Sequence, residues 1–172
     1  LRAPCAAGIA GLVFAVLFVV ALVLLRTVPI YDAGDEAIAD WFASGGDTAI
    51  VIGALYCIPF AAVMFLWFVA VIRDQIGDRE DQFFATVFFG SGLLFVALLF
   101  LEAAVAGSLV VGVRYLGQAP PDQATVDLIR SLAYTVMFAM ATRAAAVFMI
   151  ATATVGYRSG VFPRWFAIVG YA

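Results

Sequence analysis

Histidine and lysine are both missing from this chain of 172 residues, and cysteine occurs only twice. Without histidine, the chain has no imidazole to hold haem iron or zinc, or to serve a Ser-His-Asp or Cys-His catalytic site. Cys5 and Cys57 belong to opposite ends of two different apolar runs, so we predict no disulfide between them. We therefore expect no metal and no cofactor, and we favour a non-catalytic role over an enzyme.

Charge is also scarce in the sequence. Only 12% of the residues are charged and 66% are hydrophobic, whereas a soluble domain is nearer a quarter charged and half apolar. A polar surface cannot be assembled from this composition, so the expected solvent is lipid. We predict an all-α, polytopic transmembrane helix bundle whose partners include membrane lipids and exclude nucleic acid.

Long apolar runs predict four complete spans and the start of a fifth. A span needs about 20 residues to cross a hydrocarbon core of about 30 Å. The predicted spans cover residues 5–25, 49–72, 83–113 and 126–156, with a fifth beginning at 165–172. Pro59 predicts a kink in the second span, because proline has no N–H to donate. We expect the fifth span to continue beyond Ala172 in a longer protein.

Arginines near the span ends predict the orientation of the chain, since positive charge is enriched in cytoplasmic loops. One side collects Arg2, Arg73, Arg79, Arg158 and Arg164, and the other has Arg26 and Arg114. Abundant Ala, Val, Gly and Arg without Lys is also typical of a high-GC bacterial genome. We therefore predict a bacterial plasma-membrane protein with a cytoplasmic N-terminus and an outer loop over residues 27–48.

The outer loop is acidic and contains a short amphipathic segment. Ile38, Trp41 and Phe42 recur there at helical spacing. This pattern predicts a short interfacial helix with Trp41 and Phe42 at the level of the lipid headgroups. Ser44, Gly45 and Gly46 follow it and are expected to end the helix.

Two charges interrupt the apolar runs, Glu102 in the third and Arg143 in the fourth. Neighbouring spans run antiparallel, and counting residues from their shared end places the two about 8 Å apart in depth. An unpaired arginine at midplane costs on the order of 3 kcal/mol, so we predict a Glu102–Arg143 pair. Arg130 is a second possible partner of Glu102. The pair is open to three interpretations: a structural register, a contact with another subunit or a headgroup, or a proton or solute path.

Small and hydroxyl side chains recur along one side of the fourth span. Such residues permit the close helix contacts on which association in lipid depends. We predict that this side is buried against other helices; it comprises Thr135, Ala139, Thr142, Ala146 and Ala153.

The last twenty residues carry a turn motif, formed by Gly156, Tyr157, Arg158, Ser159, Gly160, Phe162, Pro163, Arg164 and Trp165. This segment resembles uncharacterised bacterial multispanning integral membrane proteins of unknown function, which share a Gly-Tyr-x-Ser-Gly-x-Phe-Pro-Arg turn between spans. The resemblance implies five or six spans in the complete protein and no particular activity. In such a turn, Arg158, Arg164 and Trp165 suit contact with headgroups at the membrane interface.

These features support three candidate functions. The first is a non-catalytic accessory or structural subunit that packs against a larger membrane protein complex or self-associates. The alternative is a small transporter or channel-like protein with a polar path along Glu102 and Arg143. An enzyme that acts on lipid through the acidic loops at 32–40 and 74–81 is the third.

Overall fold

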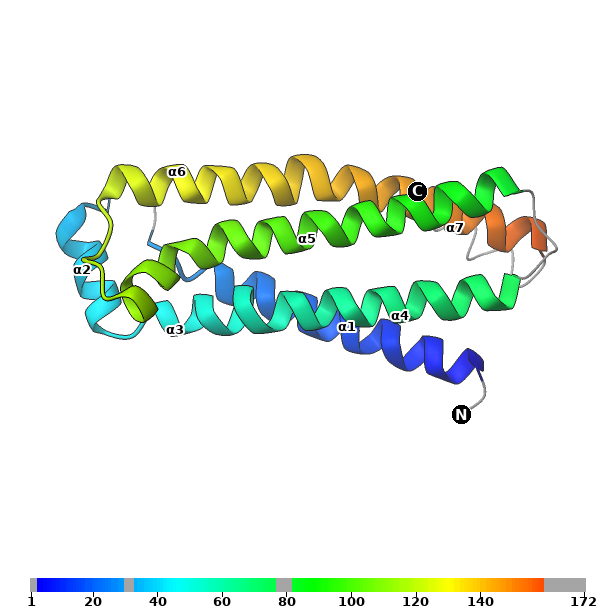
Figure 1. Ribbon diagram of the computed structural model, residues 1–172, viewed down its shortest axis with the longest axis horizontal. Helices are drawn as coiled ribbons and strands as arrows, with labels where there is room; N and C mark the ends of the chain where they lie inside the picture. The colour runs from blue at the N-terminus through cyan, green and yellow to red at the C-terminus, as the bar shows by residue number, and fades with distance from the viewer. Residues whose placement is uncertain (1–2, 30–32, 77–81, 160–172) are drawn as a thin grey trace.

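The computed structural model describes residues 3–29, 33–76 and 82–159, and these fold almost entirely into helices arranged as a bundle (Figure 1). Within these residues, 4 helical rods are long and apolar enough to cross a membrane. This confirms the predicted all-α, polytopic class. Residues 160–172, which include Arg164, Trp165 and the fifth apolar run, lie outside the described residues.

Each rod has defined bounds, and two of them contain a π-helical stretch, labelled η. The first rod is α1 (Ala3–Leu25). The second consists of α3 (Asp47–Ile50), η1 (Val51–Cys57) and α4 (Ile58–Ile76). The third is α5 (Gln82–Leu116), and the fourth consists of α6 (Gln123–Tyr134), η3 (Thr135–Ala141) and α7 (Thr142–Ser159).

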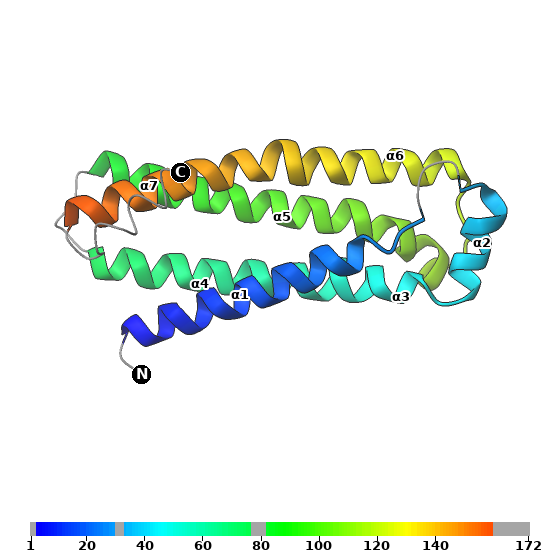
Figure 2. The same cartoon turned by 180° about the vertical axis from the view of Figure 1, so that it is seen from behind.

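The short helix α2 (Asp35–Ala43) lies at one end of the bundle, beside the starts of α3 and α6 (Figure 1). We call this end the α2 end and the opposite one the distal end. The helix α1 packs against α4 and diverges from the bundle towards its N-terminus (Figure 2). With 35 residues, α5 is about 52 Å long at 1.5 Å per residue. This length exceeds a hydrocarbon core of about 30 Å, so a membrane-spanning α5 would project from the membrane or tilt within it.

The predicted glycine turn ends α2. The N–H of Gly45 donates to the Phe42 carbonyl over 3.1 Å, and the N–H of Gly46 donates to the Trp41 carbonyl over 2.9 Å. Gly45 has a φ of 80°, which suits a residue without a side chain. A Cβ on Gly46 would lie 2.2 Å from Nε1 of Trp41. The absence of that Cβ therefore lets the indole lie against the backbone of the turn.

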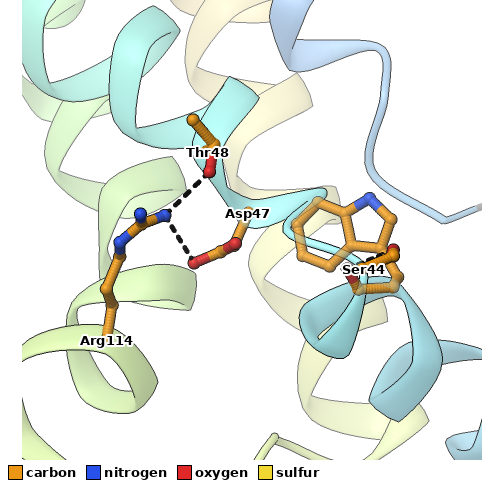
Figure 3. Close-up of polar contacts among 5 residues, drawn as sticks. Ser44, Asp47, Thr48 and Arg114 are labelled. Atoms are coloured by element: carbon orange, nitrogen blue, oxygen red, sulfur yellow. Dashed lines mark hydrogen bonds and ion pairs between the residues drawn. The ribbon is translucent and has the colours of Figure 1, made fainter.

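An ion pair joins the second and third rods at the α2 end (Figure 3). Nη1 of Arg114 donates to Oδ2 of Asp47 over 3.0 Å and to Oγ1 of Thr48 over 2.9 Å. Asp47 is only 7% exposed, so its carboxylate is buried but has a cationic partner. The pair connects the first residue of α3 to the last turn of α5.

Asp122 caps the start of α6. Its Oδ1 accepts a hydrogen bond from the N–H of Thr125 over 3.0 Å. This bond supplies an acceptor for one of the N–H groups that the first turn of a helix leaves without a partner. The hydrogen bonds from Thr125 favour the ionised carboxylate and hold the pKa of Asp122 below its ordinary value.

An aromatic cluster fills the bundle towards its distal end. The ring of Phe65 on α4 lies 5.1 Å from that of Phe14 on α1, 5.1 Å from that of Phe95 on α5 and 4.9 Å from that of Phe148 on α7. All four rods thus contribute a phenylalanine to one contact. These are favourable centroid separations for aromatic pairs, so the cluster joins all four rods in this half of the bundle.

Candidate functional site

The half of the bundle nearer α2 contains a cavity of about 130 Å³. It lies between the end of α1, the middle of α5, and α6 with the start of η3. Most of its lining is aliphatic or aromatic. Among the described residues, the charged ones that line it are Arg26, Glu102 and Arg130. Glu102 and Arg130 belong to the third and fourth rods and Arg26 follows the end of the first, so the cavity joins charges that are far apart in the sequence.

Glu102 lies on the buried side of α5, where the helical repeat places apolar residues elsewhere. Leu99, Ala103 and Ala106 occupy the same side and are all buried. Glu102 is 3% exposed, and among the described residues its Oε2 has no hydrogen-bond partner. A buried carboxylate without a partner is costly, by several kcal/mol if ionised. A glutamate at a position suited to leucine therefore marks this as a candidate binding position.

The two arginines of the cavity come from the α2 end. Arg26 follows the last residue of α1 and is exposed, whereas Arg130 lies in α6 and is half-buried. Nη1 of Arg130 donates to the carbonyl of Pro29, and its guanidinium lies 5.8 Å from the centre of the Tyr134 ring. Arg130 is the second predicted partner of Glu102. The structure places both in the lining of one cavity, but it gives Oε2 of Glu102 no bond to Arg130.

Arg143, the first predicted partner, points away from Glu102. It is exposed, and its Nη1 donates to the carbonyl of Ala139 in its own rod. The predicted Glu102–Arg143 contact is therefore not formed. Most of the predicted buried side of this rod also faces outward, because Thr135, Thr142 and Ala146 are exposed and Ala139 is half-buried. Ala153 alone of that set is buried.

The π-helical stretch η3 explains the outward position of Arg143. On α6, the residues that pack inward include Val126, Ile129 and Ala133, and an uninterrupted seven-residue repeat would place Arg143 on the same side. Beyond η3, the buried series is instead Ala141, Ala144, Phe148, Ala151 and Val155, one residue later. Each π turn closes between residues five apart instead of four. The N–H of Thr142 bonds the Met137 carbonyl in this way. One extra residue rotates the remainder of the rod by about 100°.

The predicted interface residues are only partly described. Trp41 and Phe42 are half-buried, with ring centres 4.9 Å apart, and pack against the cluster around Ile38 and Ile50. Contact between these two rings and headgroups stays a prediction. The backbone of Arg158 belongs to the last turn of α7, and its side chain is outside the part of the chain that the structure describes, as are Arg164 and Trp165.

Comparison with known proteins adds no further information: no family model, no curated protein and no solved structure matches this chain. The fold and site therefore define the class: within the described residues, the protein is all-α, with four potential membrane-spanning rods and a cavity lined by two arginines and a buried glutamate. The sequence pattern singles out Glu102 and Arg130, but not Arg26 as their neighbour. The sequence could not predict this neighbour, because Arg26 is only a charge at the end of an apolar run and reaches the cavity through the packing of the helices.

Proposed function

We propose that this protein is a non-catalytic membrane subunit that binds the apolar helix of a partner through the surface around Arg143. We define this surface by the exposed residues Thr135, Thr142, Arg143 and Ala146. The proposal includes a bacterial plasma membrane and a cytoplasmic N-terminus, which would place the α2 end outside. The resemblance to multispanning membrane proteins of unknown function, stated in the sequence analysis, is consistent with this proposal.

The observation that supports the proposal is the environment of Arg143. This residue lies about 20 Å along the rod from Tyr157, inside a span that covers Gln123–Tyr157. Its exposed neighbours Phe138, Met140 and Val147 are apolar, so this side of the rod suits lipid or another apolar helix. A guanidinium facing hydrocarbon costs about 3 kcal/mol or more. An acidic side chain on a partner helix would offset that cost and would fix the depth at which the two helices meet.

A photo-crosslinking amino acid at Ala146 tests this proposal in intact membranes. Ala146 is exposed and lies one turn from Arg143, whereas Val16 on α1 is a matched exposed control on another face. We expect a protein adduct from position 146 and only lipid adducts from position 16. Mass spectrometry should identify a partner with Asp or Glu inside an apolar segment.

The dependence on charge separates specific binding from simple proximity. Arg143→Met should abolish the adduct from position 146, and Arg143→Lys should retain it, because the ammonium keeps the charge. Equal lipid adducts at both positions, or an adduct that persists in Arg143→Met, would contradict the proposal.

A further inference from the structure

We propose that the cavity beside Glu102 binds a small zwitterion, a molecule with a primary ammonium group and a carboxylate or phosphate. This inference is independent of the partner at Arg143, which lies on the outer surface of the bundle. It begins with Oε2 of Glu102, an acceptor that is buried and unpartnered among the described residues. A ligand N–H aimed at this oxygen would form a charge-assisted hydrogen bond in surroundings of low dielectric.

The arginines decide which kind of donor fits. Among the described residues, Arg26 and Arg130 line the same cavity as Glu102 and make part of its lining cationic. A simple cation would meet Glu102 but would be repelled by both guanidinium groups. A simple anion would suit the arginines but would leave Oε2 of Glu102 without a donor. A molecule that carries both charges satisfies the acid and the arginines together.

The size and lining of the cavity limit the rest of the ligand. A cavity of about 150 Å³ accommodates benzene, so the volume of about 130 Å³ here suits a compact molecule. Leu22, Ile50, Ala106 and Met137 contribute apolar parts of the wall. Small amino acids meet these limits, and so does the ethanolamine phosphate headgroup of a lipid whose chains stay in the membrane. Both present a primary ammonium and an anionic group a few bonds apart.

Binding to the whole protein in phosphatidylcholine nanodiscs tests the free ligands. The probes are 2-aminobutyrate and phosphoethanolamine, and the single-charge controls are propylamine and butyrate. Isothermal titration should show saturable binding of at least one zwitterion and affinities weaker by about tenfold or more for both controls, the loss of one charged contact. A control that binds as tightly as the zwitterions would overturn the proposal.

A second arm distinguishes a lipid from a free solute. Nanodiscs that contain phosphatidylethanolamine should raise the unfolding temperature above the value in phosphatidylcholine, whose quaternary ammonium has no N–H for Glu102. A rise in this arm without binding of the free probes assigns the cavity to a headgroup, and binding of the free probes without the rise assigns it to a solute. If neither arm responds, the proposal is refuted.

Variants connect either result to the cavity. Glu102→Gln removes the charge with little change of shape, and Ala133→Leu fills the cavity from α6 while leaving its charges in place. Both variants should weaken the binding of the zwitterion by about tenfold or more. Glu36→Gln, on an exposed position of α2, should leave the binding unchanged. Unaltered binding in both cavity variants would place the ligand elsewhere and would contradict the assignment.

Discussion

Glu102 and Arg143 occupy neighbouring rods and opposite environments. Glu102 lines a cavity on the buried side of α5, and Arg143 is exposed on α7. Since Glu102 shares its cavity with Met137 and Phe138, it lies near their level, about one and a half turns from Arg143. The separation between them is therefore mainly rotational. Charges of opposite sign at similar depth inside apolar helices need not pair, because the phase of each helix decides which side they face.

The largest effects on folding should come from single-residue deletions that rotate one part of a helix against the other. Deleting Ala104 from α5 would rotate one half of this helix by about 100° against the other and turn either Leu99 or Leu109 out of the core. Burial of a single leucine is worth about 2–5 kcal/mol, so we expect the protein not to fold. Deleting Ala139 from η3 should be tolerated, because it removes the extra residue and leaves the buried series on both sides continuous. Size-exclusion chromatography and thermal unfolding in mild detergent would compare the two deletions.

Equal loss of folding in the two deletions would contradict the assignment of one extra residue to η3. Deleting Ala119, an exposed residue in the connection before α6, provides a control for shortening the chain outside a helix.

A smaller change in the free energy of unfolding is expected when either of two buried acids is replaced, and its sign should depend on whether the acid has a bonding partner. Glu102→Leu should raise the free energy of unfolding by about 1 kcal/mol or more, because it removes an unpartnered polar group from apolar surroundings. Asp47→Leu should lower it by about 1–2 kcal/mol, because it removes the bonds with Arg114. Thermal unfolding monitored by tryptophan fluorescence would measure both changes. The comparison fails if the two changes have the same sign.

The smallest effect is expected for the coupling between Glu102 and Arg143. Because the two side chains do not meet, the effects of Glu102→Gln and Arg143→Met on stability should add to within about 0.5 kcal/mol in the double variant. A coupling energy well above this value would indicate that the pair forms in the membrane. The Asp47–Arg114 pair is the positive control, since a cycle on these two residues should show coupling.

The four long helices were predictable from the sequence because each one contains a long and mainly apolar run. Hydropathy along the chain suffices to find such a run. The end of α2 was also predictable, since Gly45 and Gly46 act through local backbone geometry. The inward side of the fourth rod was not, because a regular repeat does not continue across Thr135–Ala141, where the structure has a π-helix. The cavity escaped prediction for a different reason: Arg26, Glu102 and Arg130 come together only when three rods pack.

The Asp47–Arg114 pair has a mechanical consequence for the hairpin formed by the second and third rods. At the distal end, α4 ends at Ile76 and α5 begins at Gln82, close together along the chain, so these two rods can separate most at the α2 end. A given angular opening displaces atoms in proportion to their distance from the distal end, and Asp47 and Arg114 lie near the opposite tips of the two rods. A modest ion pair at this position therefore resists hinge opening with the longest lever arm that the hairpin offers. The same bond placed between the distal ends of the two rods would contribute similar energy and little stiffness.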